Sequence, residues 1–448
     1  MKKTVFSLFP VLLLLAFPAV ALADISVDSA TILRFYQDDR PGLAKENYMP
    51  ATQFLGVDAD KLGDGNLSLH FYGWGRVDMK EKSYNDNYSE GSLTYGYLQY
   101  RFDQANARLR AGRFFINEGI VNEQVDGVSA RTDLPFGFGV SAFGGAAVHT
   151  ISNPGESTDG KGNEIYGGRV SFRSAGMLEL GVSGVYESTA PNFATPANQS
   201  VAQAGYFGDR RLVGGDLWLS PHRMVELMGR SSYNTETKGV AEHSYLLNVK
   251  PRKDLTFTGE FNEYGERSLF YSSIMFASLI NNLTDKSRSV GGRVSYKPVK
   301  TVEVTADYKH YTRDIGEADR FGGDLRFTIL DNAVRTGIGY HYLRSGPDFA
   351  VIPSASSSGS FHEVRAYAMR ESKTYFAAVD AIGYFFKQSI NGKSSAWELI
   401  TSLGYHLTPD LVLSGDISYG QNPQFNDEVK GLLRLTFNTN IAGKGGTK

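Results

Sequence analysis

Strict two-residue alternation of apolar and charged side chains is the feature that most restricts the fold of this sequence. Within residues 302–309, the apolar set is Val302, Val304, Ala306 and Tyr308, and the polar set is Glu303, Thr305, Asp307 and Lys309. Period-2 alternation places the two sets on opposite faces of a β-strand. A strand with one apolar face and one charged face suits a wall between lipid and water. The pattern therefore predicts an all-β, transmembrane, antiparallel up-and-down β-barrel.

A short proline motif recurs between these alternating runs. Its copies begin at Ser220, Lys250, Lys297 and Thr408, and the prolines are Pro221, Pro251, Pro298 and Pro409. Proline presets φ for a turn and cannot donate a hydrogen bond to a sheet ladder. We therefore expect each proline at the tip of a turn and not within a strand.

Short and long connections alternate along the chain. Short turns are expected near residues 64, 105, 135, 176, 221, 251, 298, 331, 372 and 409, whereas the connections between them are mostly longer and polar. This asymmetry is typical of outer-membrane barrels, with short periplasmic turns and longer extracellular loops. The spacing predicts about 22 strands, with about 20 as the alternative. The last strand is expected over residues 430–437.

A large soluble β protein, such as a propeller or a parallel β-helix, is the competing fold. Propeller blades would repeat a shared motif in each unit, and only the turn recurs here. Aromatic residues also stand near the expected strand ends, as in the interfacial girdles of membrane barrels. These aromatic residues are Phe327, Tyr340, Tyr342, Tyr405 and Tyr419.

The N-terminal segment has the three parts of a secretory signal peptide. Lys2 and Lys3 precede an apolar run over residues 11–17, and Ala21-Leu22-Ala23 forms an A-x-A cleavage site. We expect cleavage after Ala23, a barrel over residues 24–438 and a polar tail over 439–448, in a protein of the cell outer membrane. No apolar run after this segment reaches the roughly 18 residues that a membrane helix needs.

Composition excludes several classes of function. The 448 residues include no cysteine, which excludes disulfides, thiolate metal sites, a lipoprotein anchor and covalently attached haem in this chain. Lys+Arg number 46 and Asp+Glu 48, a balance that does not suit a nucleic-acid binder. The 49 glycines and 28 phenylalanines fit curved strands that are half apolar.

Extending the alternation assigns charged residues to the lumen. The basic ones are Arg76, Arg101, Arg108, Arg110, Arg169, Arg173, Arg230, Lys250, Arg293, Lys297, Lys309, Arg326, Arg335, Arg365 and Arg434. The acidic ones are Glu226, Glu260, Glu303, Asp307, Asp324, Glu363, Glu398 and Asp416. One interpretation is a water-filled wall with paired charges. The other is a basic lumen that favours anions, with Arg76, Arg101, Arg108 and Arg110 as its patch.

Residues 267–286 lack alternation and can form a short helix. Its apolar residues are Leu269, Phe270, Ile274, Met275, Phe276, Leu279 and Ile280. The segment is expected either to fold into the lumen as a constriction or to pack against the barrel rim or a partner protein.

The sequence gives little support for an enzymatic function or for a metal-binding site. Ser68 and His70 share a strand face, but no acid that would orient the histidine is evident. The eight histidines are scattered and do not form a metal-binding cluster, so no metal or other cofactor is expected. A TonB-type transporter would need a large plug domain before its barrel, whereas alternating strands are expected here almost from Asp24.

The sequence resembles a Gram-negative, porin-like outer-membrane protein. The resemblance rests on the features above and on Leu109-Arg110-Ala111-Gly112-Arg113-Phe114-Phe115, which is similar to a strand frequent in porin hairpins. It covers the whole mature chain as an architecture. A difference is the C-terminus, where porin-like barrels end on an aromatic residue, whereas here Phe437 is followed by a polar tail.

The resemblance implies passive diffusion of small hydrophilic solutes or ions through a monomeric or homotrimeric porin. The chain also resembles the barrel partners of extracellular electron conduits, which sheathe multihaem cytochromes. That resemblance implies a scaffold for a periplasmic or surface partner.

Overall fold

The computed structural model describes most of the chain after residue 23. The described residues are 24–38, 46–63, 65–81, 88–148, 164–174, 176–188, 209–265, 286–313, 316–346, 359–423 and 427–441. The predicted signal peptide lies outside them, as do the apolar residues of the segment 267–286 and the end of the predicted tail. Those expectations stay predictions.

The described chain consists of antiparallel strands and two short 3₁₀ turns, and none of its helices is long and apolar enough to cross a membrane. The strands of the first half are β1 Asp24–Asp38, β2 Glu46–Tyr48, β3 Pro50–Leu62, β4 Leu67–Asp78, β5 Ser89–Phe102, β6 Ala107–Glu118, β7 Val121–Asp133, β8 Phe138–Ala147, β9 Glu164–Ser174, β10 Leu178–Glu187 and β11 Arg210–His222. Those of the second half are β12 Val225–Asn234, β13 Gly239–Arg252, β14 Leu255–Tyr264, β15 Ser287–Val299, β16 Val302–Arg313, β17 Gly316–Ile329, β18 Val334–Ser345, β19 Phe361–Glu371, β20 Tyr375–Ile390, β21 Lys393–His406, β22 Leu411–Gln421 and β23 Glu428–Ile441. The 3₁₀ turns are η1 Asp103–Ala105 and η2 Pro135–Gly137.

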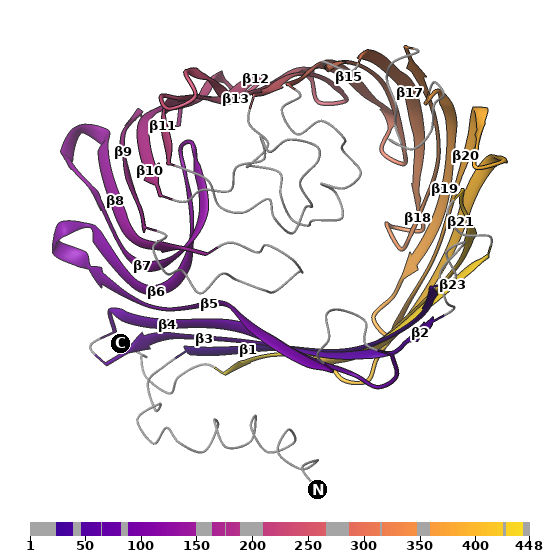
Figure 1. Ribbon diagram of the computed structural model, residues 1–448, viewed down its shortest axis with the longest axis horizontal. Helices are drawn as coiled ribbons and strands as arrows, with labels where there is room; N and C mark the ends of the chain where they lie inside the picture. The colour runs from indigo at the N-terminus through magenta and orange to yellow at the C-terminus, as the bar shows by residue number, and fades with distance from the viewer. Residues whose placement is uncertain are drawn as a thin grey trace, which may run out of the picture.

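The strands close into one ring (Figure 1). Consecutive strands pair with each other, and β1 pairs with β23 from Ile25↔Ile441 to Tyr36↔Lys430. Strands β2 and β3 pair with β1 in one continuous antiparallel register. In such a register the two residue numbers of every pair have the same sum, as they do for Tyr36↔Tyr48 and Leu33↔Ala51. They are therefore two parts of one wall strand. The predicted closed barrel of 22 strands is confirmed.

The wall has an apolar outer face and a polar inner face. Large apolar side chains that the barrel leaves exposed, such as Val182, Leu403 and Ile417, alternate along their strands with polar residues on the inner face. In β16 the outer set is Val302, Val304, Ala306 and Tyr308, as the alternation predicted. Tyr405 and Tyr419 lie on the outer face near strand ends, where girdle residues are expected, whereas Tyr340 lies on the outer face in the middle of β18.

The prolines lie in strands and not at the turn tips, so that prediction was wrong for three of the four positions. Pro221, Pro251 and Pro298 belong to β11, β13 and β15, and the turns follow two residues later. The register shifts at each of them, between Leu219 and His222 in the first case. A residue at such a bulge does not have to donate a backbone hydrogen bond to the neighbouring strand. Proline, which has no backbone N–H, is therefore tolerated there. Pro409 does lie in a turn, between β21 and β22.

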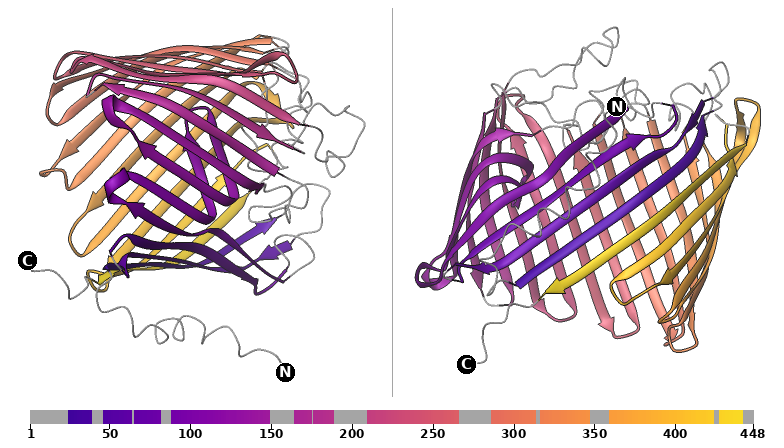
Figure 2. Two further views of the ribbon diagram at one scale, coloured as in Figure 1. Left: turned by 90° about the vertical axis from the view of Figure 1, so that its left-hand side faces the viewer. Right: turned by 90° about the horizontal axis from the view of Figure 1, so that it is seen from below.

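The last strand continues beyond the expected boundary at residue 438. Strand β23 runs to Ile441, and Ile441 pairs with Ile25 at the closure of the ring. The outward-facing series from Leu433 through Phe437 therefore lies inside a paired strand and is not its final part. The strands cross the wall at a tilt, as Figure 2 shows from the side.

Candidate functional site: the inner face and a folded hairpin

The β6–β7 hairpin separates from the barrel wall near its middle. Strand β6 pairs with β5 only as far as Gly96↔Arg113, and the pairing of β7 with β8 begins at Val125↔Ala147. Between these points β6 and β7 pair only with each other, ending at Glu118↔Val121. We call residues 114–125 the folded tip. Figure 1 shows this tip inside the ring, beside β10 and β11.

The hairpin turns back over its own inner face. Glu118 Oε1 lies 3.3 Å from Arg108 Nη2 in the same strand. In a straight strand, residues ten apart would be separated by about 33 Å. Strand β7 bends in the same way, because Arg131 Nη1 also lies 3.3 Å from Glu118 Oε1. The bend falls beside Gly112, whose φ of 128° lies in a region that L side chains rarely adopt.

An apolar contact holds the folded tip against the inner wall. From the tip it includes Phe114, Ile116, Ile120, Val121 and Val125; from the wall it includes Ala147, Ile165, Val185, Leu212 and Ala241. The turn at Gly119 approaches so closely that an added Cβ would lie 2.1 Å from Ser183 Oγ. The tip therefore covers the inner face of β9, β10 and β11, as a second layer.

Buried ion pairs join this layer to the wall. The Arg210 guanidinium of β11 pairs with Glu123 of the tip and, at 2.7 Å, with Glu187 of β10. Beneath the turn, and within the wall itself, Arg169 of β9 pairs with Asp216 of β11 at 2.5 Å and with Glu179 of β10 at 3.0 Å. Such pairs stabilise an arrangement mainly by making its disruption costly, since each partner would leave a buried charge behind.

One face of the tip packs against the wall through its apolar side chains. The opposite face is therefore turned to the lumen. Phe115, Asn117 and Asn122 lie on this second face and are exposed. At the root of the tip, Arg113 donates to both oxygens of Asp126 and to the carbonyl of Leu93 in β5. The structure thus contains an internal element that sequence analysis did not predict.

Arginines lie side by side below the folded tip. Arg101, Arg108 and Arg131 are direct cross-strand neighbours on β5, β6 and β7. Arg110 lies on the same face, one step along β6, where it donates to Gln99 and lies over the ring of Tyr97. A cavity of about 220 Å³ opens between Arg108, Arg110, Arg131 and the folded tip, and Glu118, Ser129 and Ser141 also line it.

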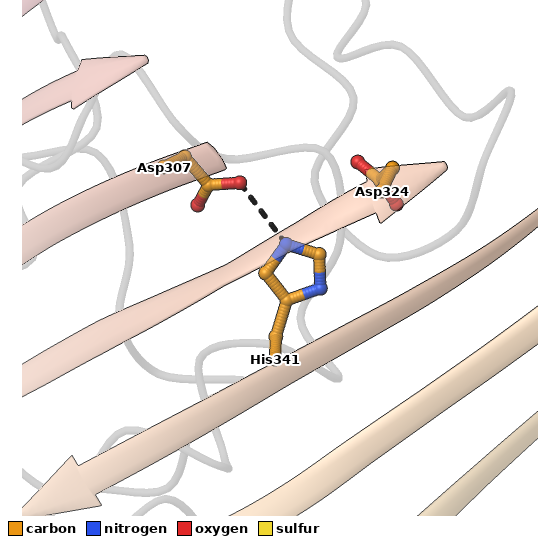
Figure 3. Close-up of side chains that lie close together, drawn as sticks. All are labelled: Asp307, Asp324 and His341. Carbon is orange, nitrogen blue, oxygen red and sulfur yellow. Dashed lines mark hydrogen bonds and ion pairs between the residues drawn. The ribbon is translucent and has the colours of Figure 1, made fainter. Parts of the chain in front are cut away.

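A second polar cluster spans β16 to β19 on the far side of the ring. Figure 3 shows His341 Nε2 bonded at 3.0 Å to Asp307, with Asp324 on the strand between them. These three groups lie close enough to offer ligand atoms to one metal ion, an arrangement that sequence analysis did not expect from scattered histidines. Arg320 contributes a positive charge, 3.2 Å from Asp307, and Thr305 donates to Asp324. This internal pairing gives the cluster a structural role without a metal.

The register places the predicted lumen charges on the inner face. Several lie in ion pairs: Arg76–Glu90, Arg173–Glu179, Arg230–Glu242, Glu303–Lys297, Lys309–Glu260, Arg326–Asp324, Arg335–Glu371, Glu363–Arg320 and Arg365–Asp380. Glu226 accepts from the indole of Trp218, and Arg293 stands opposite Asp307. Arg76 is buried in its pair, and Arg434 shares the inner face with Asp416 of the next strand.

Sequence analysis missed several inner acids. Glu118, Glu179, Asp216, Glu242 and Asp380 all bind arginines, so a large part of the apparent basic excess is neutralised. Their strand parity was a signal that could have found them. The unneutralised positive charge that remains between β5 and β7 is local.

The structure also corrects the statement that no acid orients His70. Asp58 of β3 lies 2.5 Å from His70 Nδ1, and the ring of Tyr97 stacks on the imidazole. Within the described chain, however, no hydrogen bond joins Ser68 to His70. The histidine is thus held in a structural pair and is not arranged to activate that hydroxyl.

Comparisons with known proteins identify the fold. No family model matches the sequence, and no curated protein matches it. A mutant of the ferric enterobactin receptor PfeA from Pseudomonas aeruginosa matches with a TM-score of 0.56 and 10% identity, over 94% of this chain and 81% of that one. OccK8 (OprE) from the same organism matches with a TM-score of 0.45 and 12% identity, over 94% of this chain and 98% of that one.

The likeness to the receptor concerns the fold alone, and that fold is a large closed antiparallel barrel. The ring closure, the apolar outer face and the charged inner face agree with it. By its architecture, the chain is a large closed antiparallel β-barrel, with the apolar outer face and the charged inner face of a wall between lipid and water.

Proposed function

We propose that this protein is a passive channel for small hydrophilic solutes or ions across the outer membrane. The observation that carries the proposal is the inner face, where charged side chains from strands all around a closed ring point toward one lumen. A continuous charged surface keeps water in the lumen and lets hydrated solutes diffuse along it. Size and charge are the filters.

The folded tip is the internal element that narrows the lumen in this proposal. Strands about 4.8 Å apart and tilted by about 40° give a 22-strand ring a backbone diameter on the order of 44 Å. A hairpin lying on the wall adds a layer about 10 Å thick. The tip therefore makes the lumen asymmetric, with the arginines on its side and the Asp307–His341 cluster on the other.

Single-channel recording in a planar bilayer tests the proposal. The purified mature chain is expected to give steady open-channel steps in potassium chloride, with a linear current–voltage relation near zero voltage. A barrel that is folded, as judged by circular dichroism and heat-dependent gel migration, but gives no steps would contradict it. That outcome would favour a barrel that sheathes a partner such as a multihaem cytochrome.

Shortening the hairpin is expected to increase conductance. Replacing residues 114–125 by an Asn-Gly turn removes the folded tip and keeps the wall ladders of β5–β6 and β7–β8, apart from the terminal pair Val125↔Ala147. Two strands about 4.8 Å apart in a layer about 10 Å thick fill on the order of a tenth of the lumen cross-section. Conductance should rise by about that fraction. An unchanged or lower value in a correctly folded variant would show that the tip does not limit flow.

A further inference from the structure

We propose that the cavity beneath the folded tip is a binding site for a small dianion, such as a dicarboxylate or sulfate. This inference deepens the proposed channel function by naming a class of solute and the arginines that recognise it. The site consists of Arg108, Arg110 and Arg131, with Arg101 beside them and the folded tip above.

The first step of the argument is the repulsion within the arginine row. Arg108 lies directly opposite both Arg101 and Arg131, and like charges in direct cross-strand positions destabilise a sheet. The four guanidinium groups, Arg110 included, have two carboxylates as ion-pair partners in the described chain: Glu118, and Asp133 at 3.6 Å from Arg131. Two positive charges are thus left in excess, and an incoming dianion would neutralise them.

A second pair of cross-strand cations in the same wall shows that opposed basic side chains do not always carry an excess of positive charge. Lys309 and Arg320 also lie directly opposite each other on the inner face. There each cation has its own carboxylate, since Lys309 pairs with Glu260 at 2.7 Å and Arg320 with Asp307 at 3.2 Å. The unmatched arginines are found where the chain has built a cavity.

The second step is the position of Glu118, which shows how the site holds a carboxylate. Its Oε1 lies 3.3 Å from both Arg108 and Arg131, and its carboxylate accepts a hydrogen bond from Ser141. Arg110 points into the same cavity with no carboxylate partner in the described chain, because its Nε donates to the neutral side chain of Gln99. A second anionic group can therefore be bound beside Glu118.

The third step concerns size and donors. The cavity of about 220 Å³ is several times the roughly 30 Å³ that a water molecule occupies in the liquid, so a small dianion fits in place of a few waters. Guanidinium groups bind carboxylate and sulfate oxygens in pairs, and the Ser129 hydroxyl adds a neutral donor. The aromatic and apolar side chains of the tip shield the site from bulk water.

Calorimetric titration of the full-length mature barrel in detergent tests this site independently of conduction. Sodium sulfate and sodium succinate are titrated at low ionic strength, with sodium chloride as the monovalent reference. Either dianion should bind in a saturable manner, and Arg110→Gln should weaken that binding by roughly tenfold or more. Preference for sulfate or for succinate identifies the kind of anion.

Two further variants make the result specific. Arg365→Gln removes an inner arginine that is paired with Asp380 on the far wall, and it should leave dianion binding unchanged. Glu118→Gln removes the internal carboxylate and should strengthen binding several-fold, because it adds one more unmatched charge. The inference is overturned if neither dianion binds the folded wild-type barrel, or if Arg110→Gln and Arg365→Gln have equal effects.

The bilayer and calorimetric results separate the two proposals. A barrel that binds a dianion but gives no conductance steps refutes the channel and leaves the site standing. Conductance steps without saturable dianion binding would refute the binding site and leave the channel standing.

Discussion

Substituting Gly112 by alanine is expected to destabilise the barrel by about 2 to 6 kcal/mol, or to prevent the hairpin from folding back. Two separate costs add at this position. The φ of 128° strains any residue with a Cβ, and the new Cβ would lie 2.3 Å from the backbone oxygen of Gly96. Because the close atom belongs to the backbone of β5, no rotation of a side chain can relieve the contact.

Gly259→Ala is the matched control for this variant. Gly259 also lies within a barrel strand, β14, but nothing approaches within 4 Å of the position that its Cβ would take. Its substitution should change the free energy of unfolding little. Urea titration in lipid vesicles, followed by tryptophan fluorescence, measures both variants. Equal unfolding midpoints for the two variants would mean that the bend at Gly112 does not determine the stability of the hairpin.

The main wall was predictable from the sequence because one physical rule fixes it along its whole length. Lipid on one side and water on the other demand the same alternation in every strand, so the parity of Val302 to Lys309 predicts which residues point inward. Breaks in that alternation predicted the approximate positions of the turns. The number of strands was then predicted by counting those turns.

The proline positions show where local rules were not sufficient. Proline was expected at turn tips since it cannot donate to a ladder, but Pro221, Pro251 and Pro298 occupy bulges just before the turns. A bulge also releases a residue from donating, and a single strand read alone does not reveal the register shift. A turn tip and a bulge both accept proline, because neither needs its backbone N–H. They differ only in how the partner strand pairs with the residues around the proline.

The folded tip was not predictable because alternation does not tell which surface a face meets. Phe114 and Ile116 have the inner parity and read as apolar residues in a polar lumen, whereas the structure provides an apolar partner surface at Ile165, Val185 and Leu212. That surface comes from strands far along the chain. The acids that neutralise the inner arginines were missed for a similar reason, since Arg169 and Asp216 lie on β9 and β11 and meet only across the intervening strand β10.

Phe114→Ala is expected to release the folded tip from the wall while leaving the barrel closed. Phe114 is completely buried, and truncating a buried phenylalanine typically costs about 3 to 5 kcal/mol. Apart from the terminal pair Val125↔Ala147, the tip makes its strand ladder only with itself, and an isolated two-stranded hairpin is marginally stable in water. A loss of this size therefore acts on the attachment of the tip, because the wall ladders on either side do not include Phe114.

Phe115→Ala is the natural control, since it removes the same side chain from the next position and the opposite face. Phe115 is 42% exposed and contributes nothing to the apolar contact with the wall. The chain has no cysteine, so Asn117→Cys introduces a single site for a spin label on the lumen-facing side of the tip. The label should become markedly more mobile with Phe114→Ala and stay unchanged with Phe115→Ala.

Open-channel current noise provides a second readout of the same motion. A tip that detaches and returns should add fluctuations between two conductance levels in the Phe114→Ala channel, with the upper level matching that of the shortened hairpin. An immobile label and quiet current in Phe114→Ala would mean that the ion pair of Arg210 with Glu123 holds the tip without the apolar contact. The energy that keeps the hairpin inside the lumen would then be electrostatic, and its attachment would depend little on salt, because buried ion pairs are only weakly screened.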